Sequence, residues 1–191
     1  MINLSDSKSV RDSVTQLFSQ GDFEAGVTLL QKTESIPRFV ELECIGNMHF
    51  YKRELQKAIE SYELAISIQP GYEIARYQYL VGTQDERQGD FISAFKRYQS
   101  AIDIEPTFVD AYFELGGLLV KVGDFEGAAQ CYRDAVKLAP SDLAGYYNLS
   151  AVLGKLAHTD PEKYSAELLA VDAAYEKLKE SGAPLPSAGK W

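Results

Sequence analysis

The chain has 191 residues, 46% of them hydrophobic and 25% charged, which fits one folded domain or one uninterrupted repeat array. Its 19 basic and 28 acidic residues give a formal charge of −9. Because nucleic-acid affinity comes mainly from lysine and arginine neutralising phosphates, we expect no nucleic-acid partner. The sequence shows no secretory signal, no apolar run of about 18 residues, and two cysteines too far apart for a disulfide framework, so we expect a cytoplasmic protein without membrane insertion.

A short pattern recurs along the chain at a period of 34 to 36 residues. The turn sequence Gly-Asp-Phe begins at Gly21, Gly89 and Gly123. A set of two alanines, a tyrosine and a proline follows in three of the repeats: Ala58, Tyr62, Ala65 and Pro70; Ala94, Tyr98, Ala101 and Pro106; Ala128, Tyr132, Ala135 and Pro140. The earliest copy is degenerate, with Gly26, Leu30 and Thr33 in place of alanine, aromatic and alanine.

Each copy of the pattern predicts two helices and a turn. Apolar residues at helical spacing, such as Tyr112, Leu115 and Leu119, predict the first helix. The Gly-Asp-Phe turn ends it, because glycine accepts a left-handed conformation and aspartate caps the next helix. A proline such as Pro140 ends the second helix, since it has no N–H to donate. One pair cannot bury its apolar face alone, so the pairs should stack into a solenoid.

The run from Tyr112 to Pro140 resembles a complete tetratricopeptide repeat, and the resemblance extends over about nine-tenths of the chain. It implies an all-α, right-handed solenoid of about five helix-turn-helix units in a single domain over residues 1–180. The units are expected at about residues 7–38, 39–72, 73–108, 109–142 and 143–180. The third unit has two extra residues, which we place near Gln84 and Arg87, and Arg53 replaces the turn glycine of the second.

The last helix differs from the others. Asp160-Pro161 predicts its start, as an N-cap followed by proline at the first helical position. An apolar stripe then runs over about 20 residues through Tyr164, Leu168, Val171, Tyr175 and Leu178. We expect a long helix that caps the solenoid, with a homodimer seam along the same stripe as the alternative. Residues 181–191 form a predicted flexible tail that ends in Trp191, a possible docking peptide.

Residues suited to catalysis are few. The two histidines are His49, expected to be packed within a first helix, and His158, expected in the loop before Asp160. No glycine-rich phosphate loop, His-Glu-x2-His or Cys-x2-Cys motif is present, and Gly116-Gly117 lies within a predicted helix. We therefore predict no enzyme activity, no metal and no cofactor.

The resemblance implies that the first helices line a concave, peptide-binding face. Seven residues after each of three prolines stand Tyr77, Phe113 and Tyr147, and four residues later stand the smaller Val81, Gly117 and Ala151. These rings and their small neighbours predict an aromatic groove. In the first two units the corresponding positions hold Arg11 and Glu43, then Thr15 and Asn47, and Asn47 could hydrogen-bond a peptide backbone.

The function predicted from these residues is that of a protein-interaction scaffold or adaptor, which holds an apolar or mildly basic segment of a partner. The family's chaperone-carboxylate clamp is not expected, because Glu43, Asp110 and Glu114 occupy the places of its cations. One alternative is a structural protein that self-assembles through the terminal helix or tail. Another is a substrate-specific chaperone or regulatory subunit in secretion or envelope assembly.

Overall fold

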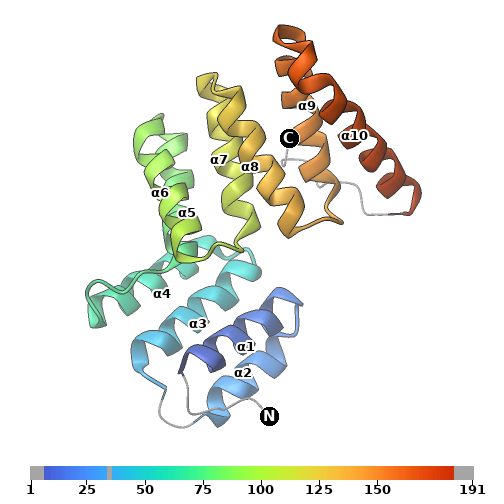
Figure 1. The fold of residues 1–191 in the computed structure, drawn as a ribbon. Helices are drawn as coiled ribbons and strands as arrows, with labels where there is room; N and C mark the ends of the chain where they lie inside the picture. The colour runs from blue at the N-terminus through green and yellow to red at the C-terminus, as the bar shows by residue number, and fades with distance from the viewer. Residues whose placement is uncertain (1–6, 34–35, 183–191) are drawn as a thin grey trace. The chain divides into compact units, whose positions relative to one another are not determined.

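The computed structural model describes residues 7–33 and 36–182, and these residues form helices joined by short connections (Figure 1). The helices of the described residues are α1 (Ser7–Ser19), α2 (Phe23–Lys32), α3 (Arg38–Tyr51), α4 (Leu55–Ile68), α5 (Ala75–Arg87), α6 (Phe91–Ile104), α7 (Val109–Val122), α8 (Phe125–Leu138), α9 (Leu143–Thr159) and α10 (Pro161–Glu180). They pair in chain order as five repeats. The all-α fold predicted from the repeated pattern is confirmed.

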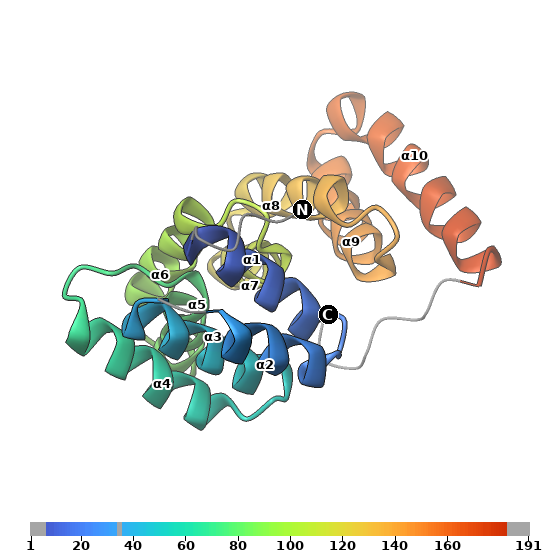
Figure 2. The ribbon, with the colours of Figure 1, turned by 90° about the horizontal axis from the view of Figure 1, so that it is seen from below.

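The chain divides into two compact units, an N-terminal unit of residues 1–80 and a C-terminal unit of residues 81–191. The division falls within α5. In the C-terminal unit, α7 packs on α8, α8 on α9, and α9 on α10 (Figure 2). The single domain over residues 1–180 therefore stays a prediction.

The turns between paired helices follow the chemistry that the Gly-Asp-Phe sequence predicts. The glycines Gly21, Gly89 and Gly123 have φ angles of +82°, +83° and +86°. The aspartates cap the following helices: Asp22, Asp90 and Asp124 accept hydrogen bonds from the N–H groups of Ala25, Ser93 and Gly127. Glycine relieves the steric cost of the left-handed conformation, and the carboxylate satisfies an N–H that the helix leaves unpaired.

Arg53 takes the same left-handed conformation without being glycine, with φ at +63°. This geometry costs an L-residue roughly 1–2 kcal/mol. Replacing Arg53 by glycine should therefore raise the free energy of unfolding of the N-terminal unit by about 1 kcal/mol. Urea unfolding followed by circular dichroism measures the effect. Lys52→Gly is the matched control, because Lys52 is right-handed with φ at −77° and should gain nothing; equal gains at both sites would contradict the prediction.

Paired helices approach closely because a glycine on one faces a ring on the other. Gly46 lies against Tyr62, and a Cβ built on Gly116 would come within 2.7 Å of the ring of Tyr132. The first repeat exchanges the two partners: its glycine, Gly26, is on the second helix and its ring, Phe18, is on the first. The degenerate repeat therefore keeps the same glycine-against-ring packing.

The same packing fixes the alignment of α5. A Cβ on Gly82 would lie 2.9 Å from the ring of Tyr98, so Gly82 is the equivalent of Gly116, 34 residues on. The two extra residues of this repeat consequently lie before Gly82, in the connection that leads into α5, and not near Gln84 and Arg87. The position equivalent to Phe113 is then Tyr79 rather than Tyr77.

The first helix of the array has a polar outer side. In α9, the residues at helical positions 2, 3, 6, 7 and 10 are all buried: Ala144, Gly145, Asn148, Leu149 and Val152. The same positions of α1 hold residues that are exposed or half-buried and line a shallow hollow: Lys8, Ser9, Asp12, Ser13 and Gln16. A polar outer side is what a terminal repeat needs for solubility.

Candidate functional site

The predicted groove residues of the C-terminal unit lie on α7 and α9, and two rings among them differ in burial. Phe113 is only 8% exposed. Its ring lies 6.3 Å from that of Tyr132, and a Cβ on Gly145 would be 3.7 Å from its Cζ. Tyr147, at the equivalent position of α9, is 44% exposed. Phe113 is therefore a packing residue between repeats, and Tyr147 is the more exposed of the two rings.

Tyr147 has a ring partner on the following helix, as Phe113 does. Its centroid lies 6.4 Å from that of Tyr175 on α10, with the planes at 50°, against 6.3 Å and 45° for Phe113 and Tyr132. The α9–α10 pair thus repeats the ring geometry of the α7–α8 pair. The difference in exposure comes from the next helix in the array: α9 brings Gly145 over Phe113, while Tyr147 belongs to the last pair of described helices.

Small residues follow Tyr147 on α9, and Gly117 stands on α7 at the position equivalent to Ala151. Ala151 and Gly154 are exposed, and a Cβ on Gly154 would meet nothing within 4 Å. On α7, a Cβ on Gly117 would meet only the Tyr132 hydroxyl, at 3.9 Å. The first-helix residues of α9 thus combine a partly exposed ring with small, exposed side chains.

Two further residues of the predicted groove, Tyr77 and Val81, lie on α5. Tyr77 and Val81 are both half-buried, and the division between the two units falls between them. By the glycine-against-ring alignment, Tyr79 and Thr83 occupy the positions equivalent to Phe113 and Gly117. Tyr79 packs against Phe50 with the ring centroids 6.0 Å apart.

In the N-terminal unit, the predicted groove residues belong to a buried polar cluster. Asn47 is 1% exposed; its amide nitrogen donates to Thr15 over 2.9 Å, and its oxygen accepts from the Tyr62 hydroxyl over 2.8 Å. Both sides of the amide are thereby engaged. The hydrogen bond to a bound peptide that the sequence predicts for Asn47 would require this arrangement to open.

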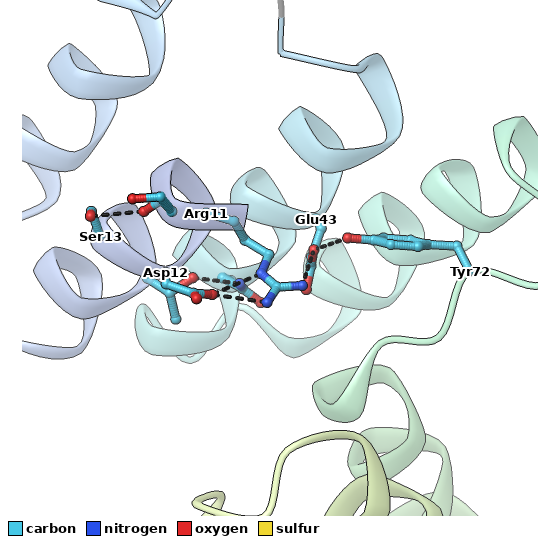
Figure 3. Close-up of polar contacts among 8 residues, drawn as sticks. Arg11, Asp12, Ser13, Glu43 and Tyr72 are labelled. Carbon is cyan, nitrogen blue, oxygen red and sulfur yellow. Dashed lines mark hydrogen bonds and ion pairs between the residues drawn. The ribbon is translucent and has the colours of Figure 1, made fainter. Parts of the chain in front are cut away.

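Glu43 is the centre of the neighbouring part of the cluster and is 6% exposed. The Tyr72 hydroxyl donates to its carboxylate over 2.6 Å, and the Arg11 guanidinium lies 3.9 Å from the same oxygen (Figure 3). Arg11 also donates two hydrogen bonds to Asp12. Burial and the hydrogen bond to Glu43 raise the pKa of Tyr72 above its usual value. For Arg11, burial alone would lower the pKa, but the Glu43 and Asp12 carboxylates raise it.

These hydrogen bonds give the cluster a structural role that the sequence patterns do not reveal. Tyr72 stands in the connection lengthened by two residues, and its hydroxyl reaches a carboxylate 29 residues earlier in the chain. A tyrosine close behind the repeat's proline is the only sequence signal for this contact. In the N-terminal unit, charged and amide side chains fill the positions where the C-terminal unit has rings and small residues.

The histidines and cysteines do not assemble into a reactive site. His49 is half-buried on α3, as predicted, and its Nδ1 lies 2.6 Å from a Glu54 oxygen. His158 lies within α9, not in the predicted loop, because the helix continues to Thr159. Burial raises the pKa of the Cys44 thiol to about 12 and of the Cys131 thiol to about 11. Within residues 7–33 and 36–182, no three His, Cys, Asp or Glu side chains are grouped to hold a metal ion.

The long last helix begins as predicted. The Asp160 side chain accepts from the N–H of Lys163, and proline occupies the first turn. The stripe from Tyr164 to Leu178 is buried or half-buried, as expected of residues that pack on α9. Arg133 on α8 donates to both carboxylate oxygens of Glu167 over 2.6 and 2.8 Å, which ties α10 to the preceding pair. The predicted Trp191 tail lies outside the described residues, apart from its first two positions.

The described helices include none that is both long enough and apolar enough to cross a membrane.

Comparison with known proteins agrees with the repeat pattern. A tetratricopeptide repeat family model matches residues 87–153, and a second one matches residues 45–72. The search of curated proteins returns no match. Among solved structures, a crystal structure of MamA is 18% identical, covers 88% of this chain and 95% of its own, and superposes with a TM-score of 0.54. A second MamA crystal structure is also 18% identical, with 93% of each chain covered and a TM-score of 0.52. At this identity the likeness concerns the fold alone.

Proposed function

Because this chain is a tetratricopeptide repeat protein, we propose that it is an interaction scaffold that holds a polypeptide segment against the first-helix face of its C-terminal unit. This face consists of Gly117 on α7 with Tyr147 and Ala151 on α9. The observation that carries the proposal is the 44% exposure of Tyr147 among small neighbours. Exposed aromatic anchors are the residues in which binding energy tends to concentrate.

The bound segment is apolar or mildly basic. A ring beside glycine and alanine favours an aliphatic or aromatic side chain. The formal charge of −9 favours approach of a segment with basic residues at its ends. The work of the protein is binding in the cytoplasm, not catalysis. The predicted contributions of Tyr77, Val81, Phe113, Glu43 and Asn47 would be indirect, through the packing that holds the first helices in place.

Self-assembly from end to end is the less favoured function. The last repeat of a second copy would have to pack on the outer side of α1, where Lys8, Asp12 and Gln16 are exposed. Removing these charged and amide groups from water would oppose such a contact. A dimer through the α10 stripe would compete with α9 for the same residues.

Placing a long side chain at Gly117, on the proposed binding face, tests the proposal. Gly117→Arg should leave the fold intact, since a Cβ is accommodated there and arginine favours a helix over glycine. Its long side chain should weaken capture of a specific lysate partner by at least about tenfold, a loss of about 1.4 kcal/mol. Mass spectrometry of the captured protein gives the readout.

The matched control is Ala173→Arg, which adds the same charge on an exposed part of α10. It should capture the partner as the unsubstituted chain does. Both variants must keep the helicity and unfolding midpoint of the parent. Equal capture by all three proteins would show that the first-helix face is not the binding site.

A further inference from the structure

The helix α10 has apolar residues on two opposite sides. The stripe from Tyr164 to Leu178 packs on α9 (Figure 2). The opposite side, which we call the outer face of α10, has four exposed apolar residues at helical spacing: Ala166, Leu169, Ala170 and Ala173. Leu169 is 70% exposed, more than most large apolar side chains of the described residues. The outer face is therefore distinct from the contact with α9.

Charged residues border the outer face, and the two signs lie on opposite edges. Because residues seven apart share one side of a helix, each edge can be followed along the sequence. The lysine edge consists of three exposed residues: Lys163, Ala170 and Lys177. The glutamate edge consists of three exposed residues, each one position earlier: Glu162, Leu169 and Glu176. Ala166 and Ala173 lie between the two edges.

Contacts within the chain leave these charges accessible. The Lys163 ammonium lies 4.6 Å from the centroid of the Tyr164 ring, and the Glu176 carboxylate accepts from Lys179 over 3.1 and 3.3 Å. The charged groups of these contacts are all exposed, and exposed pairs on a helix surface contribute little free energy. A partner with the opposite charges could therefore engage either edge.

We infer that the outer face of α10 pairs with the same face of a second copy of this chain, with the two helices parallel and in register. A two-fold axis along the helices sets each lysine edge against the partner's glutamate edge. Leu169 then packs on the partner's Ala170, and the two copies of Ala173 meet at the axis. An antiparallel pair would instead bring Lys163 close to the partner's Lys177, so the charge pattern selects the parallel arrangement.

The charge pattern also selects a second copy as the occupant. The outer face carries both halves of the pairing, since one edge complements the other, and the chain therefore matches itself without a further partner. Four apolar side chains per copy make a small interface. We therefore expect a transient dimer with a dissociation constant of about 0.1 mM.

The dimer goes beyond the proposed function and does not depend on it. Gly117→Arg alters the first-helix face and should leave the dimer unchanged. Ala173→Arg places two like charges at the dimer axis, so it should abolish the dimer and still capture the polypeptide partner. Failure of one surface is thus distinguishable from failure of the other.

Sedimentation velocity of the full chain, from about 10 µM to about 1 mM, measures the association. Leu169→Lys should weaken it by at least about tenfold, because the new cation would face the partner's lysine edge. The matched control is Leu64→Lys, at an exposed leucine of α4, which should dimerise as the parent does. Circular dichroism checks that both variants keep the parent's helicity. A parent that stays monomeric throughout, or a dimer that survives Leu169→Lys, overturns the inference. So does loss of a foreign partner on Leu169→Lys without any dimer, which would assign the face to another protein.

Cysteine cross-linking tests the orientation. In the parallel arrangement Ala173→Cys should form disulfide-linked dimers under mild oxidation, at least about tenfold faster than Gln130→Cys, a control at an exposed position of α8. The native Cys44 and Cys131 are buried in all of these proteins. In an antiparallel pair the two copies of residue 173 would lie roughly 10 Å apart, beyond disulfide reach. Preferential linkage of an Ala166→Cys chain to an Ala173→Cys chain would show that arrangement and overturn the inference.

Discussion

Replacing Gly116 with alanine is expected to lower the free energy of unfolding of the C-terminal unit by about 2 kcal/mol, as over-packing of a core does. The added Cβ would stand 2.7 Å from Cε1 of Tyr132 and 2.9 Å from its Cζ. Tyr132 is buried between α7 and α8 and has the ring of Phe113 beside it. Because Tyr132 is only 5% exposed, the added Cβ forces a shift of its ring or of the two helices. Urea unfolding monitored by circular dichroism measures the loss.

Substituting the neighbouring Gly117 by alanine should instead raise the free energy of unfolding, and it serves as the control. Gly117→Ala adds a Cβ whose nearest contact is the Tyr132 hydroxyl, at 3.9 Å. Because glycine costs a helix up to about 1 kcal/mol relative to alanine, this substitution should stabilise the unit by a comparable amount. The two glycines are adjacent in one helix, so a similar effect of both substitutions would mean that the Tyr132 contact does not set the spacing of α7 and α8.

Arg11→Met is expected to destabilise the N-terminal unit by about 2 kcal/mol. It removes the cation next to a buried carboxylate, which typically costs about 3–5 kcal/mol for a fully buried pair. The smaller figure applies because the Arg11 side chain is 29% exposed and 3.9 Å from Glu43. Methionine keeps most of the apolar stem, so lost packing contributes little. The measurement is the urea midpoint of the N-terminal unit.

A double-mutant cycle isolates the charge effect. Glu43→Gln keeps an oxygen to which Tyr72 can donate and removes the buried negative charge. In the Glu43→Gln background, Arg11→Met should cost less than about 0.5 kcal/mol, which gives a coupling above about 1 kcal/mol. Additive effects would mean that Arg11 stabilises the unit through Asp12 or through its own packing.

The helix pairs could be predicted from the sequence because their signals are local. Glycine, aspartate and proline act through the backbone of their own turn, so Gly123, Asp124 and Pro140 mark helix ends without knowledge of tertiary contacts. The N-cap at Asp160 is a signal of the same kind. The loop predicted at His158 was wrong because α9 continues to Thr159; Gly154 lies inside the helix without a left-handed conformation and does not end it.

The alignment within the third repeat could not be predicted in the same way. Counting from Pro70 leads to Tyr77, whereas counting from Gly82 leads to Tyr79, and both residues are tyrosine. The contact of Gly82 with the Tyr98 ring decides for Tyr79, in agreement with the equal spacing from Gly82 to Gly89 and from Gly116 to Gly123. Because both candidates are tyrosines, residue type does not favour Tyr77 or Tyr79.

The candidate site was predictable in position but not in exposure. Phe113 and Tyr147 occupy equivalent places, and the difference between them comes from whether another helix covers the ring. Gly145 in the next helix is the signal that would have predicted the burial of Phe113. The burial of Glu43 and Asn47 depends on Tyr72, Thr15 and Tyr62, whose distances along the chain follow no helical period.

The restriction of contacts to neighbouring helices has a consequence for dynamics. Within the two units, α1 packs on α2 and α3, α8 on α7 and α9, and α10 on α9. Structures with such short sequence separation between contacts fold quickly and open in segments rather than all at once. Amide protons of α1 and α2 should therefore exchange with solvent independently of those of α9 and α10. A ligand held at one end of the chain would slow exchange there and leave the far end as it was, so the scaffold can engage a partner without stiffening as a whole.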